Sequence, residues 1–413
     1  MKAFIVESVM SFSYPLASRM SGVKPSFVRE VLKVAVRKDI ISFAGGLPAP
    51  ELFDVDGIRQ ATLDAFEQNP QATLQYGPTD GYDVLKNHLI DIMASRGAPG
   101  LSSHNLIVTT GSQQAIDVIA KIMVDPGDVV LVERPAYLAA VQVFEMYQAE
   151  LRGIEIDADG LDTDDLERQL QALAAEGRRA KFIYTVATFG NPSGATLSLE
   201  RRKKLLELAV KYQVLVIEDD PYSELRFSGE ILPPLVGLTD QVDGSSQWVC
   251  YFSTLSKFVA PGLRLGWMIL PEGLVQPVTI AKQAADLHTS TFAQHVAARY
   301  LETGRLQAQL PKIRSTYGAK GHAMIAALEK YFPAGMLEFK KPDGGMFLWA
   351  KMAEGVDTMG LVQKAVDNGV IYVPGVPFFP GNPKTNFLRL SFATPTPEVI
   401  EEGVQRLARA VLD

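Results

Sequence analysis

The sequence predicts an α/β fold: a large domain with a mostly parallel central sheet flanked by helices, and a smaller α+β domain formed by the C-terminal part with the N-terminal segment. Short apolar runs alternate with helical patterns through the middle of the chain, which is what a sheet buried on both faces requires. Towards the C-terminus, strands and helices follow an α+β pattern instead. The length of 413 residues exceeds one ordinary domain and suits two.

The middle of the chain carries the strand signals. Apolar runs bounded by polar or turn residues lie at 106–109, 129–133, 151–156, 182–186, 214–218, 249–253 and 265–270. Helical periodicity fills residues 112–123 and 137–147 between them. This alternation predicts the large domain, which we place at residues 55–305.

The last part of the chain predicts the smaller domain, at residues 306–413. A helix near 311–332 leads into it. Strands are expected at 345–351, 370–373 and 387–392, and helices at 359–368 and 397–412. Residues 1–54 are too few for a domain, so we expect this segment to pack on the smaller domain and on the substrate pocket.

Composition and charge exclude several classes of function. The net charge of −7 and the lack of a basic cluster argue against a nucleic-acid partner. Cys250 is the single cysteine, which excludes an internal disulfide or a CxxC site, and the five histidines lack metal-ligand spacing. No apolar stretch reaches 18 residues, so we expect no membrane span and a cytoplasmic protein without a structural metal.

Lys257 is the first candidate for chemistry. It ends the motif STLSK at 253–257, directly after a predicted buried strand. Partial desolvation lowers the pKa of a lysine and favours the neutral amine that forms a Schiff base. The hydroxyls of Thr254 and Ser256 and the guanidinium of Arg264 are donors suited to a phosphate dianion. The alternative is a surface lysine in a serine-rich turn.

Acidic residues end another predicted strand, in the motif VLVIEDDPY at 214–222. Ligands of open α/β sheets gather at the carboxyl ends of strands. A carboxylate in this position could pair with the pyridinium nitrogen of pyridoxal phosphate, which would keep the ring protonated and make it an electron sink. Tyr222 would hydrogen-bond the phenolate oxygen of that ring. An ordinary acidic turn is the alternative.

Three further segments add weaker signals. Ser112 opens a helix after TG at 110–111, where backbone N–H groups and a capping hydroxyl suit a phosphate, or simply cap the helix. Asn191 lies in a turn, GNPSG at 190–194. Arg389 lies inside an apolar strand and needs an anionic partner, either a substrate carboxylate held by two donors or a structural ion pair.

In this order and spacing, the motifs resemble the class I/II aminotransferases of the pyridoxal-phosphate fold type I family, from about Ile41 to the C-terminus. The motifs ISFAGGLP at 41–48 and LQYGP at 74–78 are closer still to the 2-aminoadipate and kynurenine aminotransferase branch and to the aminotransferase-like half of MocR-type regulators. The resemblance implies a pyridoxal-phosphate enzyme that moves an amino group between an L-amino acid and a 2-oxo acid. It also implies glutamate and 2-oxoglutarate as one substrate pair, and a homodimer with shared active sites.

The resemblance further implies a role for each site residue. Lys257 would form the Schiff base, Asp219 would partner the ring nitrogen, and Tyr222 and Asn191 would bind the ring oxygen. Further cofactor contacts would be stacking by Tyr137 and phosphate binding by Ser112, Gln113, Thr254, Ser256, Arg264 and, from the neighbouring subunit, Tyr76. Substrate contacts would be Arg389 for the α-carboxylate, with Asn191 and Gly46, and Ser26 and Arg29 of the N-terminal helix.

The chain departs from the family pattern at two points expected beside the substrate. The usual proline is missing from residues 185–190, and Ser193 stands where the family has threonine. The expected donors therefore range over aromatic, branched-chain and 2-aminoadipate-type amino acids. Another reaction on the same scaffold, such as β-elimination, stays open. A MocR-type regulator is disfavoured, because only about forty residues precede the Ile41 motif and they carry no helix-turn-helix.

Overall fold

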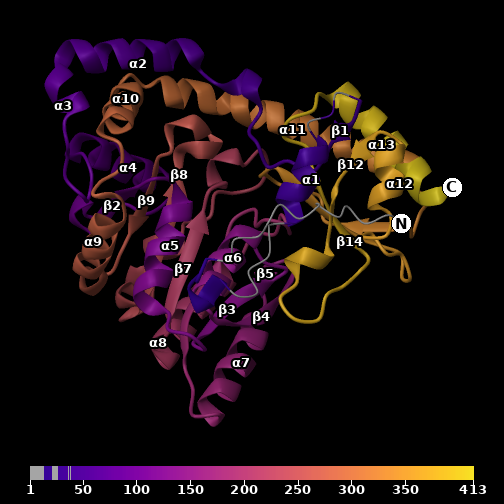
Figure 1. The fold of residues 1–413 in the computed structure, drawn as a ribbon, viewed down its shortest axis with the longest axis horizontal. Coiled ribbons are helices and arrows are strands. Elements are labelled where there is room, and N and C mark those ends of the chain that lie inside the picture. Colours follow the sequence, from indigo (N-terminus) through magenta and orange to yellow (C-terminus); the bar gives the residue numbers. More distant parts are fainter. Residues whose placement is uncertain (1–13, 21–26, 36, 38) are drawn as a thin grey trace.

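The computed structural model describes residues 14–20, 27–35, 37 and 39–413. Within these residues an eight-stranded sheet forms the centre of the larger part of the molecule (Figure 1). In spatial order its strands are β2 (Leu106–Thr109), β9 (Gly266–Ile269), β8 (Val249–Thr254), β7 (Leu215–Asp220), β6 (Ala180–Thr185), β3 (Val129–Arg134), β4 (Glu150–Asp157) and β5 (Gly160–Leu161).

The sheet is mostly parallel. Strands β8, β7, β6, β3 and β4 pair in parallel, whereas β9 is antiparallel to both β2 and β8, and β5 is antiparallel to β4. Strands β7 and β8 are buried along their whole length, including the carboxylates that end β7. Near-continuous apolar sequence is what such doubly covered strands require. The predicted α/β fold with a mostly parallel central sheet is confirmed.

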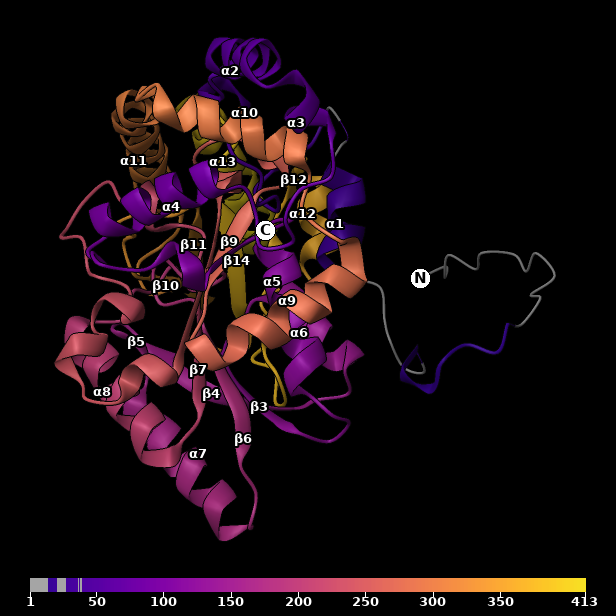
Figure 2. The ribbon, with the colours of Figure 1, turned by 90° about the vertical axis from the view of Figure 1, so that its left-hand side faces the viewer.

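Helices cover both faces of the sheet. In Figure 2, α7 and α8 lie on one side of β7, β6 and β3, and α5, α6 and α9 lie on the other. A further group, α2, α4 and α10, packs together beside the β2 end, with α3 against α10. The bounds are α2 Val55–Gln68, α3 Pro70–Leu74, α4 Asp83–Ser95, α5 Ser112–Met123, α6 Leu138–Met146, α7 Thr163–Ala175, α8 Leu199–Tyr212, α9 Glu272–Asp286 and α10 Thr291–Glu302.

A second, smaller core lies beside the first. Its antiparallel sheet has the order β10 (Leu337–Phe339), β11 (Phe347–Met352), β14 (Phe387–Ser391) and β13 (Val373–Pro374), packed with α11 (Arg305–Tyr331), α12 (Val362–Asp367) and α13 (Pro397–Leu412). Strand β1 (Ile41–Ser42) pairs in parallel with β12 (Val370–Ile371), and α1 (Phe27–Ala35) lies next to β12 (Figure 1). Helix α1 and strand β1 of the N-terminal segment therefore pack against the smaller core. The domain bounds 1–54, 55–305 and 306–413 stay a prediction.

Two elements differ from the sequence-based expectation. The helix expected from residue 311 begins at Arg305 and runs through Pro311. Proline lacks an N–H, but the carbonyl that it leaves unbonded belongs to exposed Gln307, where water can satisfy it. The strand expected at 370–373 divides into β12 and β13, because the chain leaves the pair with β1 and joins β14 on either side of Tyr372.

No helix in the described part of the chain combines the length and the apolar character needed to cross a bilayer.

Candidate active site

A cavity of about 360 Å³ lies at the carboxyl ends of the parallel strands, beside the smaller core. This is where open α/β sheets bind their ligands. Residues of the N-terminal segment, of the large sheet and of β14 all line it, so three separate parts of the chain meet there. Of the residues singled out in the sequence, it is lined by Gly46, Ser112, Gln113, Tyr137, Asn191, Asp219, Tyr222, Thr254, Ser256, Lys257, Arg264 and Arg389.

Lys257 follows β8 by three residues and points its amine into the cavity. Its Nζ donates to the carbonyl of Gly46 at 2.9 Å. Burial and then the positive charges of Arg389 and Arg264 lower the pKa of Lys257 to about 8, against the opposing effect of Asp219. A larger fraction of the neutral, nucleophilic amine is therefore present near neutral pH than for an ordinary lysine.

Asp219 lies near the end of β7, almost wholly buried. Burial raises the pKa of this carboxyl to about 7. Its Oδ2 accepts a hydrogen bond from the hydroxyl of Tyr184 at 2.7 Å, whereas its Oδ1 has no partner among the described residues. A buried oxygen without a partner is energetically unfavourable, so a ligand N–H at this position would be stabilising.

Arg389 is buried on β14 without a carboxylate beside it. Its Nη1 donates to Asn191 Oδ1 at 2.8 Å and its Nη2 to the carbonyl of Ala44 at 2.6 Å, while Nε has no partner in the described structure. The guanidinium carbon lies 4.3 Å from the ring centroid of Phe347. Burial lowers the pKa of Arg389 to about 10. Arg389 forms no ion pair with any described residue. A buried guanidinium without a carboxylate favours an anionic ligand as its partner.

Donors for an anion surround the start of α5. Gly111, at φ +80°, is the N-cap residue, and a Cβ there would stand 2.7 Å from Arg264 Nη2. Only glycine allows that close approach without strain. Ser256 Oγ lies 2.8 Å from Thr254 Oγ1 on the opposite wall. The expectation that Ser112 caps the helix is wrong: Ser112 is the first helical residue and no side-chain cap forms, so its hydroxyl stays available to a ligand.

Two tyrosines and an asparagine complete the walls. Burial raises the pKa of Tyr137 to about 12 and the pKa of Tyr222 further still, so both remain protonated donors. Tyr222 meets the ring of Phe347 edge-on at 6.0 Å. Sequence reasoning missed Phe347, Phe378 and Tyr184. An aromatic residue in an apolar run gives no sign that it faces a cavity, although the hydroxyl of a buried tyrosine such as Tyr184 needs a partner.

Known proteins resemble this chain along nearly its whole length. The family model for aminotransferase class I and II matches residues 38–407. The aromatic-amino-acid aminotransferase 1 of Thermococcus litoralis is 43% identical over 94% of this chain and 92% of its own length, and the 2-aminoadipate transaminase of Thermus thermophilus is 35% identical over 97% and 98%. The crystal structure of a Pyrococcus horikoshii kynurenine aminotransferase in complex with PMP, with 40% identity and 96% of each chain covered, superposes with a TM-score of 0.91.

The chain belongs to the class I and II aminotransferases. It is a pyridoxal-phosphate-dependent enzyme of the aromatic, 2-aminoadipate and kynurenine branch, with the fold type I architecture. The predicted family, reaction class and cofactor are confirmed.

The cavity of this aminotransferase fits pyridoxal phosphate chemically. It offers an amine of lowered pKa, a buried carboxylate oxygen without a partner, and hydroxyl, guanidinium and helix N-terminal donors for a phosphate. These are the three functions that an aldehyde, a pyridine nitrogen and a phosphate ester need from a protein.

Four predicted residues of the aminotransferase lie away from the cavity or lack a described side chain. Tyr76 is 77% exposed, beside His288 and Phe292 in another hollow of the surface. Ser193, expected beside the substrate, lines a neighbouring cavity instead, and its Oγ accepts from the N–H of Ala195. Ser26 lies outside the described residues. Arg29 belongs to α1, but its side chain is not among those described.

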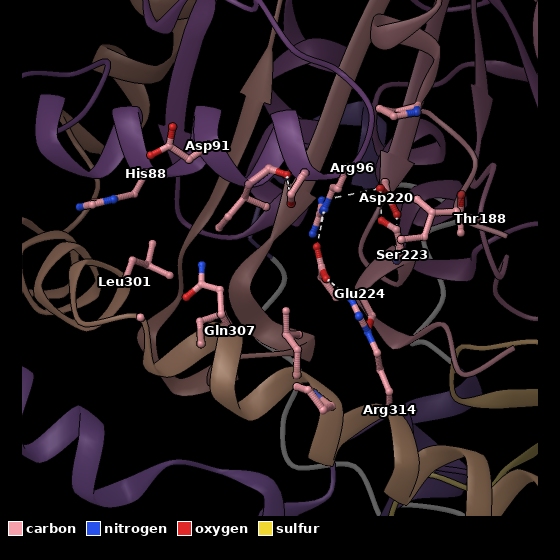
Figure 3. A pocket seen from close by; sticks show the side chains of 18 of the residues that line it. His88, Asp91, Arg96, Thr188, Asp220, Ser223, Glu224, Leu301, Gln307 and Arg314 are labelled. Carbon is pink, nitrogen blue, oxygen red and sulfur yellow. Dashed lines mark hydrogen bonds and ion pairs between the residues drawn. The ribbon is translucent and has the colours of Figure 1, made fainter. Parts of the chain in front are cut away.

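A larger cavity, of about 600 Å³, lies behind the strand end on the side of Asp220 (Figure 3). Its charged groups mostly satisfy one another: Arg96 Nε lies 2.9 Å from Glu224 Oε1, and Arg314 Nη2 lies 2.8 Å from Glu224 Oε2. The guanidinium of Arg96 also lies over the rings of Phe258 and Trp267. This side of β7 is a structural ion network: Arg96 lies within 4 Å of two carboxylates, although its Nη2 has no partner among the described residues.

Proposed function

We propose that Lys257 is the residue of this aminotransferase that joins the cofactor covalently and moves the proton, that Asp219 partners the ring nitrogen, and that Arg389 holds the substrate α-carboxylate. When bound, pyridoxal phosphate supplies an aldehyde that condenses with amines and a protonated ring that accepts the electron pair left by the departing α-proton. The observation that carries the proposal is that all three groups face one cavity while Asp219 Oδ1 and Arg389 Nε lack partners there.

Lys257 acts twice in this proposal. Its neutral amine, favoured by the pKa of about 8, first attaches the cofactor. Once free of the cofactor, Nζ would take the proton from the substrate Cα as general base and give it back as general acid. The carbonyl of Gly46, which accepts from Nζ at 2.9 Å, holds the amine in the cavity between these steps.

Arg389 and Asn191 orient the substrate. The Nε of Arg389 is free to donate to a carboxylate, and Asn191 Oδ1 fixes the guanidinium through Nη1. Holding the carboxylate sets the direction of the Cα–H bond, a positioning effect that can contribute several kcal/mol. Tyr222 and Asn191 bind the ring oxygen and Tyr137 covers the ring face. The phosphate is held by Ser112, Gln113, Thr254, Ser256 and Arg264.

The substrates are L-amino acids with apolar or aromatic side chains, together with glutamate and 2-oxoglutarate as the second pair. Leu47, Leu138 and Phe378 give the cavity apolar walls. The relatives are aminotransferases of aromatic amino acids, kynurenine and 2-aminoadipate, which supports a broad range that includes aromatic donors. Arg29 would bind the distal carboxylate of a donor such as 2-aminoadipate, and Ser26 would be a further substrate contact.

The assembly is a homodimer in which Tyr76 completes the phosphate site of the partner. Apolar side chains lie exposed around Tyr76 on α2, α3 and α10, among them Phe66, Leu74 and Phe292. A cluster of this kind favours burial against another protein surface. The cytoplasmic location stays a prediction.

Lys257→Ala tests the proposal directly. Loss of the amine removes both covalent attachment and the general base, so turnover should fall by several powers of ten while pyridoxal phosphate still binds non-covalently. The measurement is single-turnover transamination, together with retention of the cofactor through gel filtration and its release by denaturation. Near-normal transamination by Lys257→Ala would contradict the proposed role of Lys257.

A further inference from the structure

The end of β7 carries two adjacent carboxylates, each bonded to a tyrosine from a neighbouring strand. Tyr184 on β6 donates to Asp219 Oδ2 at 2.7 Å, and Tyr251 on β8 donates to Asp220 Oδ2 at 2.7 Å. Successive residues of a strand face opposite sides of the sheet. Asp219 therefore lines the active site, whereas Asp220 lines the ion network behind it (Figure 3).

The hydroxyl of Tyr184 stays protonated and so remains a hydrogen-bond donor. It is 2% exposed, and its ring meets the ring of Phe144 edge-on at 5.5 Å. Burial, and then the charge of Asp219, raise the pKa of Tyr184 well above its ordinary value, so the hydroxyl keeps its proton. In its bond with the Asp219 carboxylate, the Tyr184 hydroxyl is therefore the donor. Strand β6 fixes the direction from which Tyr184 donates.

The bond leaves the two oxygens of Asp219 unequal. Oδ2 is occupied by Tyr184 and Oδ1 has no partner among the described residues. A carboxylate held through one oxygen loses rotational freedom about its last bond and presents the other oxygen in a fixed direction. We propose that Tyr184 is a positioning residue of the aminotransferase, which holds the Asp219 carboxylate charged and turns Oδ1 to the ring nitrogen of the cofactor. This inference rests on the proposed role of Asp219.

The charged groups around Asp219 show why the hydrogen bond from Tyr184 matters for the charge of this carboxyl. Lys257, after β8, is the nearby cation that favours the charged form. Asp220 on the same strand and Glu133 on β3 are carboxyl groups whose charges oppose a charge on Asp219. Tyr184 is the one described residue that donates a hydrogen bond to it. Without this bond the pKa of Asp219 should rise further above about 7.

Tyr184→Phe removes the hydroxyl and keeps the ring. The readout is the affinity of the full-length, cofactor-free protein for pyridoxamine phosphate, which binds without a covalent bond to Lys257, titrated by fluorescence across pH. We expect affinity at neutral pH to fall about tenfold, the size of one hydrogen bond to a charged group. The acid limb of the affinity profile should move to higher pH, because the carboxylate of the variant takes up its proton earlier as the pH falls.

Tyr251→Phe is the matched control, because it loses the same kind of bond to the neighbouring carboxylate on the other face of β7. Tyr251 also accepts a hydrogen bond from Arg96 Nη1 at 2.6 Å, so Tyr251→Phe should lose at least as much thermal stability as Tyr184→Phe but keep the wild-type affinity profile. An unmoved acid limb and wild-type affinity in Tyr184→Phe, or an equal shift in Tyr251→Phe, would overturn the inference.

Asp219→Asn separates this inference from the proposed function. If Asp219→Asn binds pyridoxamine phosphate as tightly as the wild type, the role of Asp219 itself is wrong. If Asp219→Asn weakens binding and Tyr184→Phe does not, only the positioning role of Tyr184 fails. In the Asp219→Asn background, adding Tyr184→Phe should cause no further shift of the acid limb, because the titrating group is gone.

Discussion

Arg389 and Asp219 are buried polar side chains that the protein leaves incompletely satisfied. Each has one side held by the chain, Arg389 by Asn191 and the carbonyl of Ala44, Asp219 by Tyr184. Each leaves one atom, Nε or Oδ1, without a partner in the described structure. An unpaired buried polar atom is energetically unfavourable, and both side chains line one cavity, which supports the proposed roles of Arg389 and Asp219 as ligand contacts.

Arg389→Lys tests the residue scale. Lysine keeps the positive charge but loses the planar pair of donors and the contact with Asn191, so the α-carboxylate is held less well. We expect kcat/KM for the amino acid to fall by about one hundredfold, from the loss of hydrogen bonds to a charged group. Steady-state kinetics with a fixed donor measure it. The control Arg314→Lys, in the ion network with Glu224, should leave kcat/KM close to wild type. Equal effects of the two changes would contradict the account.

At the scale of elements, strand ends and the loops after them create the site, and Arg202 of α8 ties them together from behind. Its Nη2 donates to the carbonyl of Ala187 at 2.9 Å and its Nη1 to Glu218 Oε1 at 3.1 Å. It thereby joins the loop that carries Asn191 to strand β7, which carries Asp219. Arg202 is wholly buried, as is Glu218.

Arg202→Met should destabilise the enzyme by about 3–5 kcal/mol, because it leaves Glu218 buried without its cation. The displaced loop should also weaken cofactor binding. Urea unfolding followed by circular dichroism measures the first effect. The control is Arg59→Met: Arg59 pairs with Asp56 at the surface, and its loss should cost no more than about 1 kcal/mol. A stable Arg202→Met variant would refute this role.

The sequence predicted these elements well but not the contacts between them. Lys257, Asp219 and the donors at Ser112 could be found because each follows a recognisable strand or opens a helix. The partner of Arg389 could not be decided, because an arginine in an apolar strand is equally compatible with an ion pair until the neighbouring strands and loops are in place. Tyr184 was missed because its bond joins two strands whose pairing no local pattern specifies. The start of α11 was predicted too late, at Pro311. The helix continues through Pro311 because the carbonyl left without a backbone donor belongs to the exposed residue Gln307.

At the scale of the whole molecule, the site is assembled from the large sheet, the smaller core and the N-terminal segment, and the proposed dimer adds the last contact. Gly46, Lys257 and Arg389 come from these three parts and meet in one cavity. Tyr76 lies outside that cavity and is exposed, as a residue would be that serves the site of a partner.

Mixing two impaired variants, Lys257→Ala and Tyr76→Ala, tests this shared site. Lys257→Ala lacks the amine, and Tyr76→Ala should lose about tenfold in phosphate-dependent cofactor affinity. A mixed dimer of the two has one site with both defects and one wild-type site, if Tyr76 crosses the interface. Dissociation and reassociation should therefore restore activity at limiting cofactor. No recovery in dimers shown to be mixed would place Tyr76 elsewhere.

The central claim, that this cavity transfers amino groups, is tested most directly by the absorbance of the purified enzyme after adding single amino acids without any oxo acid. The account predicts that the visible band of the cofactor converts to the band of its aminated form, with one equivalent of 2-oxo acid released, and that aromatic donors and glutamate convert it. A band that stays unchanged with every amino acid, or ammonia release without conversion of the cofactor, would contradict it.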